Sequence, residues 1–220
     1  MKKVYLALSV AALLTGCVST APTKTVATAT NVQAVTASEN LITDPQFTLF
    51  RKNKGESDAW VKLTEKDKGI GDAGSSGTTA FGPEGSVRFR FKNATDDFTA
   101  QPGVIQTVKG LQANTDYELS LYYNDKKGQG SPSQLIYGVQ DLAGKSIATK
   151  EVHINDLENA PKGVSDKRFR QTFISFNSGS NTEVKVYAKL NITDPSRIKM
   201  DGNIGSQTEV RLDEVILIKE

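Results

Sequence analysis

The protein has 220 residues, with 27 Lys and Arg, 25 Asp and Glu, and a formal net charge of +2. Lys2, Lys3 and Lys24 precede residue 39, so the rest of the chain is nearly neutral, which argues against a globally basic nucleic-acid-binding protein. The chain has one Cys and one His, Cys17 and His153. A disulfide, a transition-metal centre and a Ser-His or Cys-His nucleophile therefore lack the residues they need.

Residues 1–16 are interpreted as a lipoprotein signal peptide. Two lysines precede an apolar run over residues 4–14, which is too short to span a bilayer. The residues Leu14-Thr15-Gly16-Cys17 follow, and they resemble the lipobox that bacterial lipoprotein peptidase cuts before the cysteine. Acylation of Cys17 would anchor the protein in a membrane. Val18 and Ser19 in place of Asp resemble outer-membrane sorting; the alternative is a cleaved signal followed by an accidental cysteine.

Residues 17–38 are expected to form the acylated Cys17 and a flexible tether. Beyond Cys17 the segment is rich in Thr, Ala and Val, carries one charge at Lys24, and has no sustained apolar period. Such a segment buries too little surface to order itself. Fully extended, at ~3.3 Å per residue, it would reach up to about 70 Å.

Residues 39–220 are long enough for one domain with its own core, and we expect a monomer. No amphipathic helix of convincing length is found. Short runs of strand character recur instead, separated by connectors rich in Gly, Asn, Asp and Ser, which is typical of an antiparallel β-sandwich or jelly roll. The expected strands are 41–49, 59–63, 79–82, 86–92, 103–109, 117–123, 134–140, 146–154, 169–176, 183–190 and 209–218.

The stretch 103–123 is predicted to be a central hairpin. Val104, Gln106 and Val108 alternate with their neighbours at the period of a strand, and Tyr117, Leu119, Leu121 and Tyr123 share one face of a second run. Gly110 and the residues 113–116 between them have turn chemistry. We therefore expect a strand pair that a second sheet covers.

The same stretch carries a family resemblance. Its pattern, GL-x-ANT-x-Y-x-LS-x-YY, resembles the central strands of carbohydrate-binding modules of the galactose-binding-like jelly-roll superfamily, of the family 4, 9, 16 and 22 kind. The segment 40–47 resembles their opening strand, 173–179 and 184–187 their late strands, and 212–215 their closing strand. The resemblance implies an all-β jelly roll that binds polysaccharide without catalysis.

The resemblance also implies a structural calcium ion between the first and last strands. Asp213 stands where the closing motif supplies a carboxylate ligand. Thr48 stands where the first carboxylate would be, which removes one anionic ligand from a site that needs six to eight oxygens. Asp44 or backbone carbonyls are the expected substitutes. The alternative is that Asp213 accepts hydrogen bonds from backbone N–H groups of the first strand.

Residues 86–92 are predicted to present a cationic row. Arg88, Arg90 and Lys92 alternate with three apolar residues at about 7 Å spacing. Arginine matches carboxylates bidentately, so the row suits an acidic polysaccharide, with alginate the leading candidate. The alternative is a solvated strand face or a protected edge strand.

The predicted sugar site adds polar and aromatic residues to this row. Tyr187 matches an aromatic position that lines the sugar cleft in the resembling modules. Tyr122 has the same polar-side parity, and Gln140 and Lys185 would bond sugar hydroxyls. Either tyrosine is alternatively packed under a loop. Trp60 is expected in the core.

Two alternatives to glycan binding remain open. One is an envelope lipoprotein whose sandwich binds a protein. The other is a jelly-roll polysaccharide lyase, which resembles this chain in fold but needs a base and an electrostatic stabiliser at the sugar carboxylate. The Gln-x-His and Tyr-Phe-Lys motifs of such lyases are absent. A lone His such as His153 is more often structural than catalytic.

Overall fold

The computed structural model describes residues 40–64, 66–157 and 169–220. The predicted signal peptide, Cys17 and the tether lie outside this part of the chain. The helical elements are short: α1 (Thr48–Lys52), η1 (Lys66–Lys68), η2 (Gly128–Gly130), η3 (Ile154–Asp156), η4 (Pro195–Arg197) and α2 (Ile204–Thr208). The strands are β1 (Val61–Leu63), β2 (Asp72–Ser76), β3 (Ser86–Arg90), β4 (Gly103–Lys109), β5 (Asp116–Asp125), β6 (Ser133–Gln140), β7 (Ser146–Val152), β8 (Arg170–Asn177), β9 (Glu183–Ile192) and β10 (Val210–Lys219).

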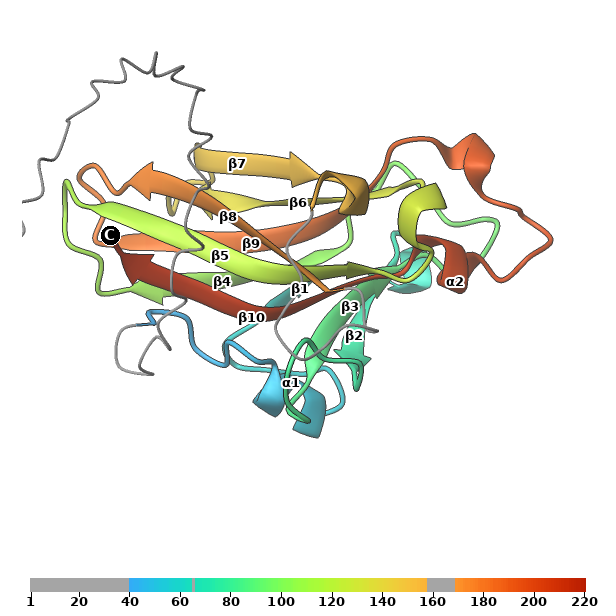
Figure 1. The fold of residues 1–220 in the computed structure, drawn as a ribbon, viewed down its shortest axis with the longest axis horizontal. Coiled ribbons are helices and arrows are strands. Elements are labelled where there is room, and N and C mark those ends of the chain that lie inside the picture. The colour runs from blue at the N-terminus through green and yellow to red at the C-terminus, as the bar shows by residue number, and fades with distance from the viewer. Residues whose placement is uncertain (1–39, 65, 158–168) are drawn as a thin grey trace, which may run out of the picture. The chain divides into compact units, whose positions relative to one another are not determined.

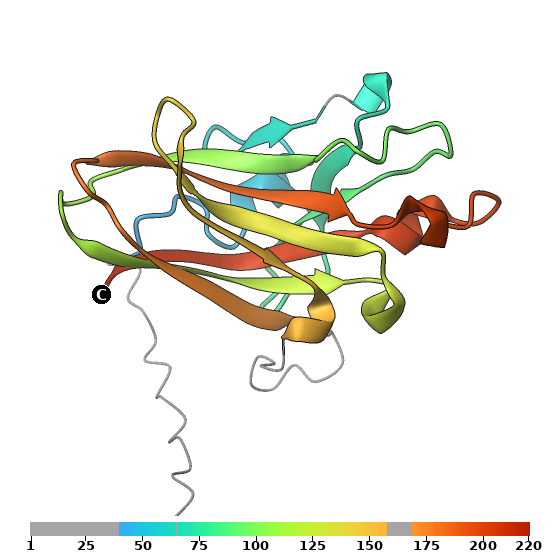
Figure 2. The same ribbon diagram turned by 90° about the horizontal axis from the view of Figure 1, so that it is seen from above.

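The strands form two antiparallel sheets of five strands each (Figures 1 and 2). Sheet A has the order β1-β4-β9-β6-β7, and sheet B has the order β2-β3-β10-β5-β8. Consecutive strands alternate between the sheets at several points, so most neighbours in a sheet are distant in sequence. This arrangement is the β-sandwich that the strand pattern predicts.

The predicted central hairpin is wrong, because β4 and β5 belong to different sheets. Residues 110–115 carry the chain across the sandwich, with Gly110 and Asn114 at positive φ. The connection bonds to the loop before β9: Leu111 N–H donates to Thr182 O and Asn114 N–H to Gly179 O. Each strand has one apolar face, and crossing over lets the two faces cover each other instead of lying side by side.

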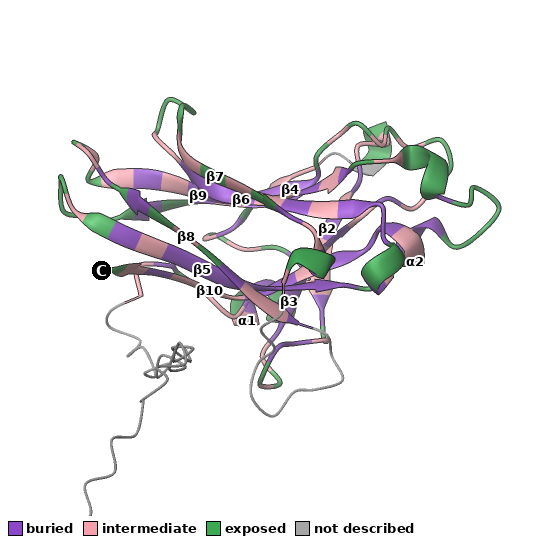
Figure 3. Cartoon of the chain, turned by 45° about the horizontal axis from the view of Figure 1, so that its top comes forward, coloured by how far each residue is buried: buried purple, intermediate pink, exposed green. Residues whose placement is uncertain are grey.

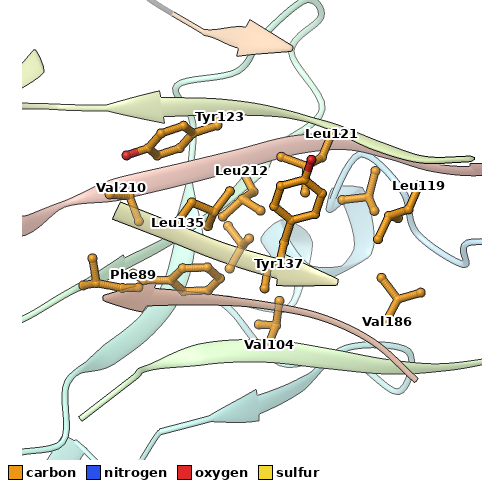
Figure 4. Close-up of a cluster of buried hydrophobic side chains, with 14 of the residues drawn as sticks. Phe89, Val104, Leu119, Leu121, Tyr123, Leu135, Tyr137, Val186, Val210 and Leu212 are labelled. Atoms are coloured by element: carbon orange, nitrogen blue, oxygen red, sulfur yellow. The ribbon is translucent and has the colours of Figure 1, made fainter. Parts of the chain in front are cut away.

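The core lies between the sheets and draws side chains from both (Figure 4). The Tyr137 hydroxyl of sheet A bonds to the Thr172 hydroxyl of sheet B at 2.8 Å, which satisfies both buried groups. Gln106 is also buried, and its side-chain amide pairs with the backbone N–H and C=O of Thr43 at 2.8 Å each. The labelled core residues are Phe89, Val104, Leu119, Leu121, Tyr123, Leu135, Tyr137, Val186, Val210 and Leu212.

The opening segment is not the strand predicted over 41–49; it is held on β10 by side-chain bonds. The Asn40 amide donates to Val215 O at 3.1 Å, and its oxygen accepts from Leu217 N–H at 3.0 Å. Leu41 N–H donates to Leu217 O at 2.9 Å. The chain then turns into α1, where Phe47 stacks on Trp60, which is in the core as predicted.

Two further differences concern strands on sheet B. Residues 79–82 form a loop, and β2, which was predicted to be a connector, pairs with β3. The sequence of β2 is Asp-Ala-Gly-Ser-Ser, which has little intrinsic strand preference. Its strand state therefore comes from pairing with β3.

Candidate functional site

The predicted sugar-binding residues do not share one surface. Tyr187, Lys185 and Gln140 lie on β9 and β6 of sheet A, whereas Arg88, Arg90 and Tyr122 lie on β3 and β5 of sheet B. Lys92 follows β3 by two residues. All of these side chains alternate with core residues, so each set faces outward from its own sheet. The prediction that the cationic row and Tyr187 form one concave face is therefore wrong.

The outward surface of sheet A is here called the sheet A face. On β4 and β6 its more exposed residues alternate with buried ones (Figure 3). The face includes Ile105, Thr107, Gln134, Ile136, Gly138, Gln140, Thr149, Glu151, Lys185, Tyr187 and Lys189.

Tyr187 lies across its neighbouring strand on the sheet A face. It pairs with Gly138 of β6, which in turn pairs with Thr149 of β7. The Tyr187 hydroxyl bonds to the Thr149 hydroxyl at 2.7 Å, so the side chain spans the strand that Gly138 leaves without a side chain. A Cβ at position 138 would meet Ala148 O at 2.2 Å. The glycine therefore permits the close approach of β6 and β7.

Lys189 covers part of the Tyr187 ring. Its Nζ atom lies 5.2 Å from the ring centroid, in a cation–π contact, and Tyr187 is 7% exposed. A sugar that stacks on this ring must first displace the lysine side chain. That displacement is modest in cost, because an exposed cation–π contact contributes only ~0.5–1 kcal/mol.

Lys185 and Gln140 lie beside Tyr187 on paired positions of β9 and β6. Lys185 Nζ donates to Leu142 O at 2.8 Å. Lys185 and Lys189 form no ion pair with a carboxylate in the described residues, whereas Lys109 pairs with Glu183 at 3.6 Å on the same sheet. The two lysines flanking Tyr187 thus keep their charge available to a ligand.

The cationic row on sheet B is largely occupied by protein carboxylates. Arg90 lies 3.2 Å from Glu209 and 3.5 Å from Asp72, and Lys92 lies 2.7 Å from Asp72. Burial alone would raise the pKa of Asp72, but the hydrogen bond from Lys92 and the nearby arginines hold it below its ordinary value. Two of the three predicted cations therefore stabilise the fold. The sequence does not predict these ion pairs, because the segment that contains Asp72 has the composition of a connector.

Tyr122 is packed against neighbouring side chains and is not accessible to a ligand. It is 8% exposed, clusters with Ala80 and Phe169, and meets the ring of Phe81 edge-on at 5.0 Å. Burial raises the pKa of its hydroxyl, and Glu214 adds to the rise. The loop around Ala80 therefore covers the face that a stacked sugar would need.

The two predicted calcium ligands have separate backbone partners. The Asp44 carboxylate accepts the N–H groups of Leu49 and Phe50 at 2.9 Å each. Asp213 accepts Ala80 N–H at 2.7 Å and Glu214 N–H at 2.8 Å. Within the described ranges no group of three or more His, Cys, Asp or Glu side chains is placed to hold a metal ion. Neither donor to Asp213 belongs to the first strand, so that alternative is wrong, and the calcium site remains a prediction.

Asp213 has an unusual environment for an acid. It is 2% exposed, and burial raises its pKa to about 8 despite the bond from Ala80, with Glu214 and Glu84 adding to the rise. Glu214 itself has a raised pKa from burial, and it is held by Gln46 at 3.0 Å.

His153 has a structural role. Its Nδ1 accepts Asn155 N–H at 3.1 Å, which leaves Nε2 to donate to Ser131 O at 3.1 Å. It caps η3 together with Asp156.

A pocket of about 510 Å³ lies at one end of the sandwich, among η2, η3 and the start of β8. Lys127 and Arg170 line it, and both donate to backbone carbonyls. It holds none of the sugar-binding residues predicted from the sequence.

No protein-family model and no curated protein matches this sequence. Solved structures do match it. The carbohydrate-binding module TmCBM61, in complex with β-1,4-galactotriose, is 18% identical with a TM-score of 0.52, over 82% of this chain and 99% of that chain.

Two larger proteins contain a similar part. The enzymatically active domain of bacteriophage CBA120 tailspike protein 4 is 9% identical with a TM-score of 0.52, over 82% of this chain and 21% of that chain. The arabinose-bound α-L-arabinofuranosidase MgGH51 is 14% identical with a TM-score of 0.50, over 82% of this chain and 26% of that chain. The chain thus spans about a quarter or less of either protein. These likenesses confirm the predicted fold class, an antiparallel β-sandwich of the jelly-roll type found in carbohydrate-binding modules.

Proposed function

We propose that the protein binds a polysaccharide through the sheet A face, without catalysis. The observation that carries the proposal is the position of Tyr187. Its side chain reaches across Gly138 to Thr149, with Lys185 and Lys189 on either side of it along β9. Once Lys189 moves off it, an aromatic ring held across the strands offers an apolar platform for the C–H face of a sugar.

The neighbouring polar groups suit the hydroxyl and acidic groups of a sugar. Gln140 offers an amide beside the ring, and Lys185 gives up only one bond to a backbone carbonyl when it turns to a ligand. Sites for small ligands combine a mainly apolar surface with a few such polar groups.

The ligand is proposed to be an acidic glycan, with alginate the first candidate. The charge contacts come from Lys185 and Lys189 and not from the sheet B row, where Arg90 and Lys92 are already paired. When a uronate displaces Lys189 from the Tyr187 ring, the ammonium group moves from a weak cation–π contact to a carboxylate. A neutral sugar offers no such exchange.

The sheet A face supports binding better than lyase chemistry. A lyase needs a proton acceptor beside the sugar carbon and a cation on its carboxylate. His153 is committed to capping η3, away from Tyr187. Incubation with alginate or pectin is expected to give no new absorbance from unsaturated ends. A steady rise that Tyr187→Phe abolishes would make the protein a lyase.

The protein is further proposed to be a lipoprotein of the outer membrane, anchored through Cys17. The lipobox-like residues 14–17 and the tether-like composition of residues 18–38 support this. Among the described residues no helix is both long and apolar enough to cross a bilayer.

Affinity electrophoresis in gels containing alginate or a neutral glucan tests the binding proposal. Retardation by alginate is expected for the unmodified protein, and loss of most of it for Tyr187→Ala. The matched control is Phe173→Ala, which removes an aromatic ring that is 52% exposed on sheet B. If Phe173→Ala abolishes retardation and Tyr187→Ala does not, the site is on the other sheet. If no glycan retards the protein, the alternative of a protein-binding sandwich is favoured.

A further inference from the structure

Two arginines lie directly opposite each other on the outward surface of sheet B. Arg88 of β3 pairs in register with Arg211 of β10, and both side chains alternate with core residues, so they share one face. Like charges at directly paired positions destabilise a sheet unless something compensates them. Each arginine therefore needs a negative charge or a hydrogen-bond acceptor close to it.

Arg211 has its compensation within the protein. Its guanidinium forms an ion pair with Glu209, and it donates to the Asn124 side chain at 3.0 Å. Arg90, the next outward residue on β3, is also paired with Glu209.

Arg88 has none. Its guanidinium makes no hydrogen bond or ion pair with any residue in the described ranges, and its Nε atom is buried without an acceptor. The Nε atoms of Arg211 and Arg90 are buried without a hydrogen-bond acceptor as well, although Arg90 Nε lies 3.5 Å from Asp72. A buried donor left unpaired destabilises the folded state, and more so when the group is charged. Two such donors on paired residues mark a place where an acceptor is missing.

The charge balance around the two arginines points to an anion. Five cations, Arg88, Arg90, Lys92, Lys126 and Arg211, surround three carboxylates, Asp72, Asp96 and Glu209. The next outward carboxylate on β10, Asp213, has its pKa raised by burial and by other acids, so it adds little negative charge at neutral pH.

The neighbouring strand β2 leaves space beside the Arg88 side chain. Its partner on β2 is Gly74, and a Cβ there would approach no atom closer than Arg88 Nε at 3.8 Å. The Arg88 side chain therefore has room to reorient over a position without a side chain.

We propose that Arg88 and Arg211 together bind one oxyanion, as a free ion or as the carboxylate or sulfate group of a saccharide. The planar guanidinium of Arg88 supplies a two-pronged donor, and Arg211 supplies a second positive charge across the strand pair. The site is independent of the proposed sheet A face, because it lies on the other sheet and uses none of the same residues.

The test is a comparison of the unmodified protein with Arg88→Gln. Thermal unfolding is followed in sodium sulfate and in sodium chloride at matched ionic strength, and in glucuronate against glucose. Sulfate or glucuronate is expected to raise the Tm of the unmodified protein above the chloride or glucose value. Arg88→Gln is expected to weaken binding at least ~10-fold, as for the loss of a charge-assisted hydrogen bond, and so to remove that difference.

Arg197→Gln is the matched control. Arg197 is exposed and donates to Gly130 O at 3.0 Å, away from sheet B, so its loss should leave the sulfate effect unchanged. A sulfate effect of equal size in Arg88→Gln overturns the proposal, because sulfate then acts through general exclusion from the protein surface.

A second measurement uses the unmodified protein alone, in case Arg88→Gln does not fold. The Arg88 Nε–H resonance is expected to shift in a saturable way when sulfate or glucuronate is added, and not with glucose. A response to glucuronate assigns the site to saccharide acids, and a response to sulfate alone assigns it to free tetrahedral oxyanions. A resonance that responds to neither overturns the proposal.

Discussion

Tyr187 and Thr149 are joined hydroxyl to hydroxyl at 2.7 Å across a strand that belongs to neither of them. The bond is possible because Gly138, between them in the sheet, has no side chain. It fixes the hydroxyl end of the side chain before any ligand arrives, so little rotamer entropy remains to be lost on binding. The ring is thereby preorganised, and Lys189 holds its place over the ring through the cation–π contact alone among the contacts described for it.

Replacing Lys189 by Met should separate the two parts of glycan binding. The variant loses the ammonium group that covers Tyr187 and serves a uronate, but it keeps a side chain of similar length. Affinity for an acidic oligosaccharide is expected to fall by up to ~10-fold, and its dependence on salt should weaken. Affinity for a neutral oligosaccharide should stay equal or rise. Calorimetry at low and high ionic strength measures both, and a parallel loss for the two ligands would contradict the assignment of Lys189.

Replacing Arg90 by Ala should destabilise the fold. The sequence pattern alone suggests an outward side chain whose loss is harmless, yet Arg90 bridges Asp72 and the buried Glu209. We expect a loss of roughly 1–2 kcal/mol in the free energy of unfolding, measured in urea. Lys109→Ala is the control, since its pair with Glu183 is exposed and should contribute close to nothing. Equal effects of the two variants would refute the structural role of Arg90.

Asp213 should make stability fall as pH rises. Its pKa in the folded protein is about 8, above its ordinary value of 3.8, so the folded state holds a proton that the unfolded state has lost between these limits. The free energy of unfolding contributed by this group therefore decreases from about pH 4 to pH 8. Asp213→Asn should flatten that slope. It should also be less stable than the unmodified protein in acid, because the amide NH₂ cannot accept one of the two backbone N–H groups.

The same variant tests calcium. If Ca²⁺ binds beside Asp213, its addition should raise the Tm of the unmodified protein, most strongly above pH 7, and leave Asp213→Asn unchanged. Magnesium serves as the control, because it demands a stricter geometry. A Tm that is insensitive to calcium across the pH range would show the calcium prediction to be wrong.

Replacing Cys17 by Ala should release the protein from membranes without unfolding it. The variant is expected in the soluble fraction, with the far-ultraviolet circular dichroism of the unmodified domain. Persistence of the variant in the outer-membrane pellet after a high-salt wash would contradict the lipobox interpretation.

The strand pattern was readable because apolar alternation reports which face is buried. It placed β4 at its observed ends and assigned the inward faces of β4 and β5, including Val104 and Leu119. Alternation does not report which strand lies beside which. The pairing of Tyr187 with Gly138 and the separation of β4 from β5 are long-range properties, so the predicted site combined residues from two surfaces.

Other parts of the site depended on partners that no local pattern reveals. The sequence pattern places Arg90 and Lys92 on an outward face. It does not show that Asp72, in a segment with weak strand preference, lies beside them and pairs with both. Tyr122 has the parity of an outward residue, and only the packing of the Ala80 loop shows that it is covered. Lys189, in contrast, was available to sequence reasoning, because it lies two residues after Tyr187 on the same strand face.

The attachment of Asn40 to β10 has a mechanical consequence. If the protein hangs from a membrane by the residues before it, any pull on the tether enters the domain at Asn40. Asn40 and Leu41 pass the load through their bonds to Val215 and Leu217. These residues belong to β10, the middle strand of sheet B, which has a neighbour on each side. The force therefore meets the most interior strand of that sheet first, so the peripheral edge strands are spared from being peeled away one hydrogen bond at a time.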